Sequence, residues 1–296
     1  MQNAAERKSA HRHSSPHWCN PAIAAAVGVI GGIIAAGPAA AQNTGDWPMA
    51  GQNLHNTRSA ANEHTIGLDN VAKLTPRWSI DTDGNVSATP TVVDGIVYFP
   101  DWGGTLWAVN AANGQVKWKK KVGDYSEIPN DVSRTTPAYW NGMLVIGQGT
   151  QLADNATGAY LIGIKADDGS MLWHARVDSE PTAIITASPV IDNGVIYGGV
   201  SSRAEALDET PKYRGSVVAL DAKTGNQLWK TYIVPEGYTG GSVWGNTPVV
   251  DHESGLLYVS TGNNFSVPEV FAGIQRKRTV SRRRRTITST ASLHST

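Results

Sequence analysis

Charged side chains and a near absence of thiols limit the chemistry that this sequence can support. Between Gln42 and Gln275 the chain carries 15 basic and 24 acidic residues, a net charge of −9. A field of this sign repels nucleic acid and anionic lipid, and it suits a neutral substrate or a cation held by carboxylates. Cys19 is the only cysteine, and no Cys-x-x-Cys-His sequence occurs. The sequence therefore predicts no nucleic-acid partner, no disulfide and no covalently attached haem.

Three of the ten tryptophans close segments that share one pattern. Each segment opens at Thr-Pro or Ser-Pro, passes through two apolar runs separated by a glycine turn, and ends at a second turn followed by tryptophan. The segments run over residues 89–118, 136–173 and 188–229. A fourth begins at Thr247 with VVDHESGLLYVSTGN and lacks its tryptophan. Trp78, in LTPRW, is interpreted as the final strand of a unit whose other strands lie elsewhere.

Each repeat is expected to form about four short strands, because Gly, Asn and Asp turns separate its apolar runs. Gly114, Gly169 and Gly225 stand where a tight hairpin turn needs a positive φ. A small sheet cannot bury both faces alone, whereas sheets stacked around an axis can, with large indoles filling the gaps. The pattern therefore predicts an all-β propeller. It also indicates a packing role, not a catalytic one, for the three closing tryptophans.

The ending Ala219-Leu-Asp-Ala-Lys-Thr-Gly-Asn-Gln-Leu-Trp229 resembles the tryptophan-docking motif of the eight-bladed quinoprotein alcohol dehydrogenases. WPMAGQNLHNTR, SATPTVVDGIVYFPDWGGTLWAVNAANG and RGSVVALDAKTGNQLWKTY resemble more particularly the polyvinyl alcohol dehydrogenases. The resemblance covers about residues 45–269. It implies an eight-bladed propeller, here incomplete, with about three full four-stranded blades and parts of others. It also implies oxidation of polyvinyl alcohol or other secondary alcohols with pyrroloquinoline quinone (PQQ) and calcium.

The resemblance assigns four residues to PQQ, a flat tricarboxylate quinone. Trp244, in GGSVWGNTP, corresponds to the indole that stacks on the quinone plane, with a core residue as the alternative. Arg134, in NDVSRTTP, corresponds to an arginine that pairs with a PQQ carboxylate, which suits a bidentate guanidinium. Thr186 and Ser202 correspond to hydroxyls that bond the cofactor rim, or else are ordinary strand-end hydroxyls.

The resemblance also assigns cofactor-binding and calcium-ligand roles to Asn263, in Ser-Thr-Gly-Asn, and to Glu205, in SSRAEALDETPKYRG. Calcium takes carboxylate and amide oxygens as ligands. For the carboxylate, Glu209 and a solvated loop acid remain alternatives. One departure from the family is the Ile128-Pro129 pair, which stands where many relatives carry adjacent cysteines. The contribution of that vicinal disulfide is expected to be absent.

In the family, the catalytic base is an Asp from a later blade, and no Asp or Glu follows Glu269 in this sequence. No catalytic residue is therefore assigned. About 225 residues resemble the family, whereas eight blades at this spacing need on the order of 400. We expect a truncated, inactive form whose ring does not close. An external acceptor such as a cytochrome c would have to take the electrons.

The two ends of the sequence differ from its middle. Residues 1–41 combine basic residues, a short apolar stretch and Ala39-Ala40-Ala41, which predicts a signal peptide cleaved before Gln42, with an uncleaved anchor as the alternative. A periplasmic or secreted location without stable membrane insertion follows. Residues 42–269 form the expected partial propeller. Residues 270–296 carry seven basic residues and no strand pattern, which indicates a frame-shifted or disordered tail rather than a nucleic-acid or membrane arm.

A second hypothesis belongs to another functional class. Non-catalytic periplasmic propellers of the outer-membrane assembly type share such repeats and bind protein partners without a cofactor. Arg134, Trp244 and Asn263 favour the enzyme, because a scaffold has no need for that set.

Overall fold

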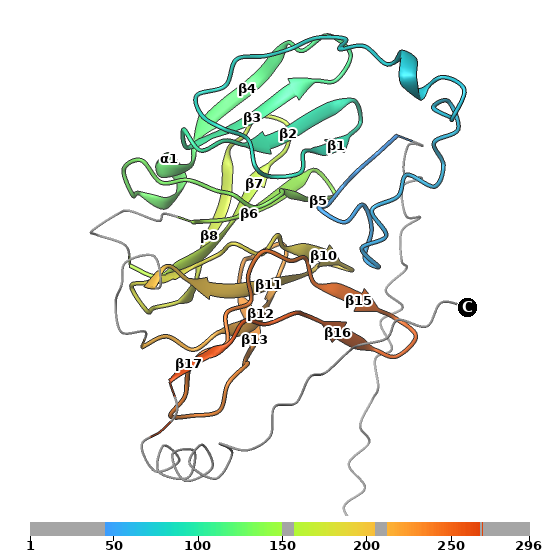
Figure 1. Cartoon of the computed structure of the whole chain (residues 1–296). Helices are drawn as coiled ribbons and strands as arrows, with labels where there is room; N and C mark the ends of the chain where they lie inside the picture. Colours follow the sequence, from blue (N-terminus) through green and yellow to red (C-terminus); the bar gives the residue numbers. More distant parts are fainter. Residues whose placement is uncertain (1–44, 150–156, 205–211, 267, 269–296) are drawn as a thin grey trace, which may run out of the picture. The chain divides into compact units, whose positions relative to one another are not determined.

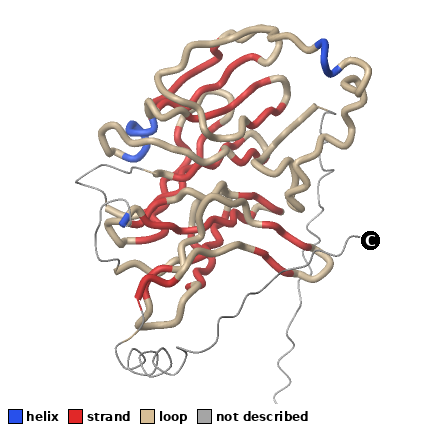
Figure 2. Tube along the Cα trace, in the orientation of Figure 1, coloured by secondary structure: helices blue, strands red, loops and turns tan. Residues whose placement is uncertain are grey.

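The computed structural model describes residues 45–149, 157–204, 212–266 and 268 (Figure 1). The predicted signal peptide, Glu205, Glu209 and the basic tail lie outside these residues. Strands dominate the described chain (Figure 2), and its helices are a 3-10 turn, η1 (Val71–Lys73), and α1 (Val122–Ser126). None of the helices in the described ranges is long and apolar enough to cross a membrane.

Three antiparallel sheets follow one another along the chain, and in each the strands pair in sequence order. Blade 1 comprises β1 (Thr91–Val93), β2 (Ile96–Pro100), β3 (Thr105–Asn110) and β4 (Val116–Lys121). Blade 2 comprises β5 (Ala138–Trp140), β6 (Met143–Gly147), β7 (Ala159–Lys165) and β8 (Met171–Asp178). Blade 3 comprises β10 (Val190–Asp192), β11 (Val195–Ser202), β12 (Ser216–Asp221) and β13 (Gln227–Tyr232), and β9 (Ala183–Ile184) pairs with the end of β11.

The remaining strands form two short pairs. β15 (Val249–Asp251) pairs with β16 (Leu256–Tyr258), and we call this pair blade 4. β14 (Thr239–Gly240) pairs with β17 (Asn264–Ser266). The predicted all-β architecture, with three full four-stranded blades and part of another, is confirmed in the described residues.

An indole hydrogen bond joins blade 1 to blade 2, and another joins blade 2 to blade 3. Trp118 Nε1 donates to the Ala166 carbonyl at 3.0 Å, and Trp173 Nε1 donates to the Ala222 carbonyl at 2.9 Å. Both tryptophans are only 9% exposed. The prediction that they pack between blades is therefore confirmed.

Trp78 docks in the same way but does not lie in the strand that its sequence predicts. Its Nε1 donates to the Ala111 carbonyl of blade 1 at 2.8 Å. The residues around it are irregular, because no described strand pairs with them. The hydrogen bond from Trp78 therefore attaches its irregular segment to blade 1 without strand pairing.

The turn glycines serve two purposes. Gly114, Gly169 and Gly225 have φ angles of 75°, 73° and 71°, as predicted. They also leave room for the docked indoles, since a Cβ at Gly169 would lie 2.8 Å from the Trp118 ring. A Cβ at Gly225 would lie 2.7 Å from the Trp173 ring. The same glycine thus permits the turn and the contact with the preceding blade.

Each closing tryptophan lies opposite a small residue of the neighbouring strand. The pairs are Ala108 with Trp118, Gly163 with Trp173 and Ala219 with Trp229. The strand register shifts directly after each small residue, and such a bulge re-aims the side chains beside it. The repeated bulge accounts for the common orientation of the indoles.

Trp229 differs from the other closing tryptophans. It is 41% exposed, and no described residue accepts a hydrogen bond from its indole. The prediction of a packed indole is therefore wrong for this residue within the described structure. The physical reason is that the described part of blade 4 contains no hairpin in the docking position.

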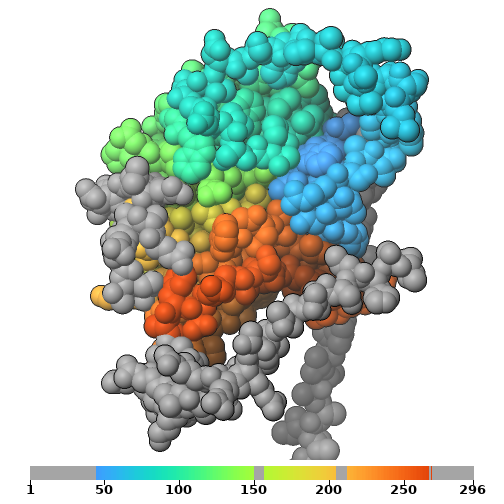
Figure 3. Space-filling view, viewed as in Figure 1, coloured from blue at the N-terminus to red at the C-terminus, as the bar shows by residue number. Residues whose placement is uncertain are grey.

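An N-terminal segment crosses the first strands of all four blades. Trp47 bridges to Val92 of β1, and the Pro48 carbonyl accepts from Tyr139 of β5. Met49 packs with Val190 and Val250, and the Leu54 carbonyl accepts from the Val250 N–H at 3.0 Å. In Figure 3 this blue segment lies directly against the orange strands of blade 4. The segment therefore ties blades that are distant in sequence.

The two roles of the docking glycine can be separated by mutation. Gly142 has a similar φ of 79°, but a Cβ there would stand in open space, whereas a Cβ at Gly169 would meet Trp118. We expect Gly142→Ala to lower the free energy of unfolding by about 1–2 kcal/mol, through the left-handed backbone alone. Gly169→Ala should lose about 1–3 kcal/mol more through overpacking. Urea unfolding of both variants tests this, and equal losses would contradict the docking role.

Candidate cofactor site

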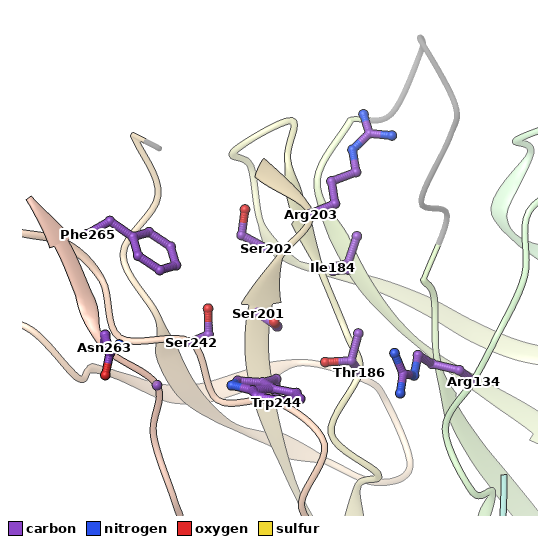
Figure 4. A pocket seen from close by; sticks show the side chains of 11 residues that line it. Arg134, Ile184, Thr186, Ser201, Ser202, Arg203, Ser242, Trp244, Asn263 and Phe265 are labelled. Carbon is purple, nitrogen blue, oxygen red and sulfur yellow. The ribbon is translucent and has the colours of Figure 1, made fainter. Parts of the chain in front are cut away.

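A cavity of about 370 Å³ opens where blades 2 and 3 meet the segments around blade 4 (Figure 4). Its lining residues are Arg134, Ile184, Thr186, Ser201, Ser202, Arg203, Ser242, Trp244, Gly262, Asn263 and Phe265. Five of the six predicted site residues are thus brought together: Arg134, Thr186, Ser202, Trp244 and Asn263. The sixth, Glu205, lies outside the described residues.

Interlocking between blades positions two of these residues. A Cβ at Gly147 of β6 would lie 2.2 Å from Ile185, so only glycine leaves space for that side chain. A Cβ at Gly199 of β11 would likewise lie 2.3 Å from the Val243 side chain. Thr186 and Trp244 directly follow Ile185 and Val243. The contacts that pack successive blades therefore also present Thr186 and Trp244 to the cavity.

Trp244 offers an open aromatic surface. It is 58% exposed, and its indole lies along the base of the cavity in Figure 4. Asn246 Nδ2 donates to the Trp244 carbonyl at 3.0 Å and fixes the backbone. Gly262 lies close to the edge of the ring, since a Cβ there would lie 3.2 Å from the indole nitrogen. An exposed indole of this kind can support a flat ring.

Arg134 supplies a positive charge at the cavity wall. Its guanidinium lies 5.9 Å from the centre of the Trp102 ring, within the range of a cation–π contact. Trp102 is itself held by a 2.9 Å hydrogen bond from Nε1 to Ser87 Oγ. Within the described ranges Arg134 has no carboxylate partner. The arginine is therefore available to an anionic ligand.

The two predicted hydroxyls differ in their surroundings. Ser202 Oγ donates to Thr182 Oγ1 at 3.1 Å and accepts from the Ala204 N–H at 3.0 Å, so it braces its own loop. Thr186 is 8% exposed, and its Oγ1 has no hydrogen-bond partner among the described residues. A buried hydroxyl without a partner is costly and calls for an explanation such as a ligand. Figure 4 shows Thr186 reaching into the cavity above Trp244.

The charge of the described lining differs from that of the chain around it. Two arginines, Arg134 and Arg203, line the cavity, and no acidic residue does. The sequence reasoning missed Arg203, together with Ile184, Ser201, Ser242, Gly262 and Phe265. Each of these residues lies within two positions of a predicted site residue, which is the signal that could have found them. The described cavity suits a planar anion.

The described residues contain no cluster of three or more His, Cys, Asp or Glu that could hold a metal. Asn263 lines the cavity, and its carbonyl accepts from the Gly241 N–H at 2.7 Å, which fixes the end of its segment. Its exposed side-chain amide could contribute one oxygen to a cation. A carboxylate ligand would have to come from outside the described ranges, as Glu205 would.

Two tyrosines with raised pKa values, Tyr98 and Tyr125, lie in a blade core and not in the cavity. Burial raises the pKa of Tyr98 to about 12, and its hydroxyl donates to the Ala166 carbonyl at 3.2 Å. Burial also raises the pKa of Tyr125, whose hydroxyl donates to the Gly169 carbonyl at 2.6 Å. Both groups remain protonated donors at neutral pH, so they are structural.

Comparison with known families and proteins gives consistent matches. The family described as outer membrane protein assembly factor BamB matches residues 72–207. A polyvinylalcohol dehydrogenase of Pseudomonas sp is 28% identical over 243 residues, which cover 74% of this chain and 36% of the relative. The quinohemoprotein alcohol dehydrogenase ADH-IIG of Pseudomonas putida is 28% identical over 258 residues, covering 76% of this chain and 34% of the relative.

Solved structures agree with the sequence matches. The structure of the quinohemoprotein alcohol dehydrogenase ADHIIG from Pseudomonas putida HK5 aligns with a TM-score of 0.61 and 25% identity. The alignment covers 75% of this chain and 35% of that protein. The chain thus spans about a third of the length of these relatives. The resemblance drawn from the repeat endings is confirmed.

The unpartnered hydroxyl gives a test that needs no ligand. Thr135 is also buried, but its Oγ1 accepts the Gly147 N–H at 2.9 Å. We expect Thr186→Val to leave the free energy of unfolding unchanged or to raise it, because no hydrogen bond is lost. Thr135→Val should lower it by about 1–3 kcal/mol, since the amide is left unpaired. Urea unfolding measures both, and a comparable loss in Thr186→Val would show that its hydroxyl is already satisfied.

Proposed function

Because the chain is a relative of the quinoprotein alcohol dehydrogenases, we propose that its cavity is part of a binding site for PQQ. The observation that carries the proposal is the combination found in one cavity. An exposed indole, an arginine without a carboxylate partner and a buried hydroxyl without a hydrogen-bond partner come from successive blades. These groups fit a flat, polycarboxylate ring system.

Each described residue has a role in this proposal. The Trp244 face would support the ring plane, Arg134 would pair with a carboxylate, and the Thr186 hydroxyl would donate to the ligand rim. Ser202 would position the loop that carries Arg203 through its bond to Thr182. When bound, PQQ would supply the quinone that accepts electrons during alcohol oxidation.

We extend the proposal to calcium, with the Asn263 amide oxygen and the Glu205 carboxylate as ligands. The support is the position of Asn263 on the cavity wall and the resemblance of both residues to the family's ligands. No residue of this chain is proposed as the catalytic base.

We also propose a reaction and its partners. Relatives named polyvinylalcohol dehydrogenase support polyvinyl alcohol or another secondary alcohol as the substrate. An external acceptor such as a cytochrome c would take the electrons. The leader-like residues 1–41 support a periplasmic or secreted location after cleavage before Gln42.

A protein-binding scaffold is the second candidate, because the family that matches residues 72–207 is described as an outer-membrane assembly factor. Such a scaffold would use blade surfaces for protein partners. It gives no reason for an exposed indole, two arginines and an unpartnered hydroxyl in one cavity. The enzyme interpretation is therefore the one we adopt.

Equilibrium dialysis of the full chain with PQQ, with and without calcium, tests the proposed site. We expect saturable binding that weakens at least about tenfold in Arg134→Ala, because a charge-assisted bond is lost. Trp244→Ala should weaken binding to a similar extent through the lost stacking surface. Arg176→Ala is the matched control, since this exposed arginine lies on the outer strand β8 away from the cavity lining.

Two results would count against the cofactor site. Absence of PQQ binding by the folded chain in the presence of calcium would favour the scaffold. Binding that Arg176→Ala weakens as much as Arg134→Ala would indicate nonspecific attraction of the anion to surface charge.

A further inference from the structure

Blade 1 reaches the cavity indirectly, through the tip of its β2–β3 hairpin. Among the described lining residues none comes from blade 1. Trp102, at the hairpin tip, nevertheless contacts one of them, because the Arg134 guanidinium carbon lies over its ring at 5.9 Å from the ring centre. In Figure 4 the guanidinium of Arg134 points toward Thr186. A residue outside the cavity therefore touches a charged group that faces into it.

The internal repeat shows that the position of Trp102 belongs to the cavity end of a blade. Trp102 is the seventh residue after Gly95, the glycine of the first turn, and the equivalent residues of blades 2 and 3 are Gly149 and Ser201. Ser201 lines the cavity. A Cβ at Gly149 would lie 4.0 Å from Cγ of Arg134, so the arginine stem passes this glycine. The equivalent positions in the next two blades thus lie at the cavity or beside Arg134.

A buried carboxylate fixes the hairpin tip that carries Trp102. Asp101 is only 1% exposed. Its Oδ1 accepts the Thr105 N–H at 3.0 Å. Its Oδ2 accepts the Asp83 N–H at 3.0 Å and the Trp107 indole N–H at 2.8 Å. A buried carboxylate with three donors is well satisfied, so the tip keeps its shape without a ligand.

Trp102 itself is held at both its backbone and its side chain. Its backbone N–H donates to the Asn85 carbonyl at 2.9 Å, and its Nε1 donates to Ser87 Oγ at 2.9 Å. The two backbone segments approach closely, since a Cβ at Gly84 would lie 2.3 Å from the Gly103 nitrogen. The indole is therefore in place before any ligand binds.

We propose that Trp102 is a positioning residue, which holds the Arg134 guanidinium at the cavity wall through a cation–π contact. A guanidinium over a ring face keeps the N–H groups at its edge available to a carboxylate. A free arginine loses side-chain entropy when it binds a ligand, and an arginine that is already held loses less. The contact joins two described residues, whereas its effect on ligand affinity rests on the proposed PQQ site.

Nuclear magnetic resonance of the ligand-free full chain tests the contact without PQQ. The chain is labelled with isotopic arginine, and the Arg134 side-chain resonances are assigned from the Arg134→Lys variant. We expect a ring-current shift of the Arg134 side-chain protons in the unsubstituted chain. Trp102→Leu should remove this shift, and Trp102→Phe should keep part of it because a ring face remains.

Equilibrium dialysis with PQQ and calcium tests the consequence for binding. Trp102→Leu should weaken binding by about twofold to fivefold, the range of an exposed cation–π contact. It should cause no further loss in an Arg134→Ala background, because the contact is already absent there. Trp102→Phe should retain most of the affinity, although it cannot donate to Ser87. Trp140→Leu is the matched control, since this tryptophan is also partly buried and does not line the cavity.

Four results would overturn the proposal. The first is that the Arg134 resonances are the same in the unsubstituted chain and in Trp102→Leu. The second is that Trp102→Leu weakens PQQ binding as much in the Arg134→Ala background as alone. The third is an equal loss in Trp102→Phe and Trp102→Leu, which would assign the effect to the bond with Ser87. The fourth is an equal loss in Trp140→Leu.

The two experiments separate this proposal from the cofactor site. If the folded chain does not bind PQQ, the proposed cofactor site fails, and the ring-current shift alone then supports or overturns the role of Trp102. Circular dichroism establishes that each variant is folded, and Trp102→Met replaces Trp102→Leu if the leucine variant does not fold.

Discussion

A buried hydrogen bond from a tryptophan indole to an alanine carbonyl recurs between blades 1 and 2 and between blades 2 and 3 of this protein. The bond is buried between two small sheets, neither of which has enough apolar surface to be stable alone. Each sheet therefore depends on its neighbour, and the stability of the array rests on contacts between adjacent units. The glycine next to each docked indole leaves room for the ring, and the register shift lies beside the tryptophan that makes the contact.

The repeat pattern was sufficient to predict the strands, the turns and the packing of Trp118 and Trp173 between blades. Local spacing fixes these features, since a hairpin turn with a positive φ needs glycine wherever the hairpin lies. The second role of Gly169 could not be predicted, because its contact with Trp118 joins two blades. The exposure of Trp229 was missed for the same reason: an indole is buried only if the neighbouring hairpin is present.

The candidate site, too, could be predicted from the sequence only in part. Resemblance to a family placed Arg134, Thr186, Trp244 and Asn263 together, and the structure brings them to one cavity. Composition alone could not separate Thr186 from Ser202, since both are hydroxyls near strand ends. Only the hydrogen bonds of Ser202 to its own loop distinguish a bracing residue from one that faces a ligand. The net acidity of the chain likewise gave no indication of a cationic lining, because the sign of a field in a cavity is set by the few charges that line it.

Blade packing and ligand binding are coupled through the backbone in this arrangement. Thr186 follows the residue that fills the space at Gly147 of blade 2, and Trp244 follows the residue that fills the space at Gly199 of blade 3. A ligand that contacts both Thr186 and Trp244 would therefore hold the two interblade contacts in place. A ligand that binds only the folded state stabilises it. Occupancy of the cavity would therefore stabilise the packing between blades to which the docked indoles also contribute. Trp229, which does not line the cavity and packs under no described hairpin, lies outside this coupling.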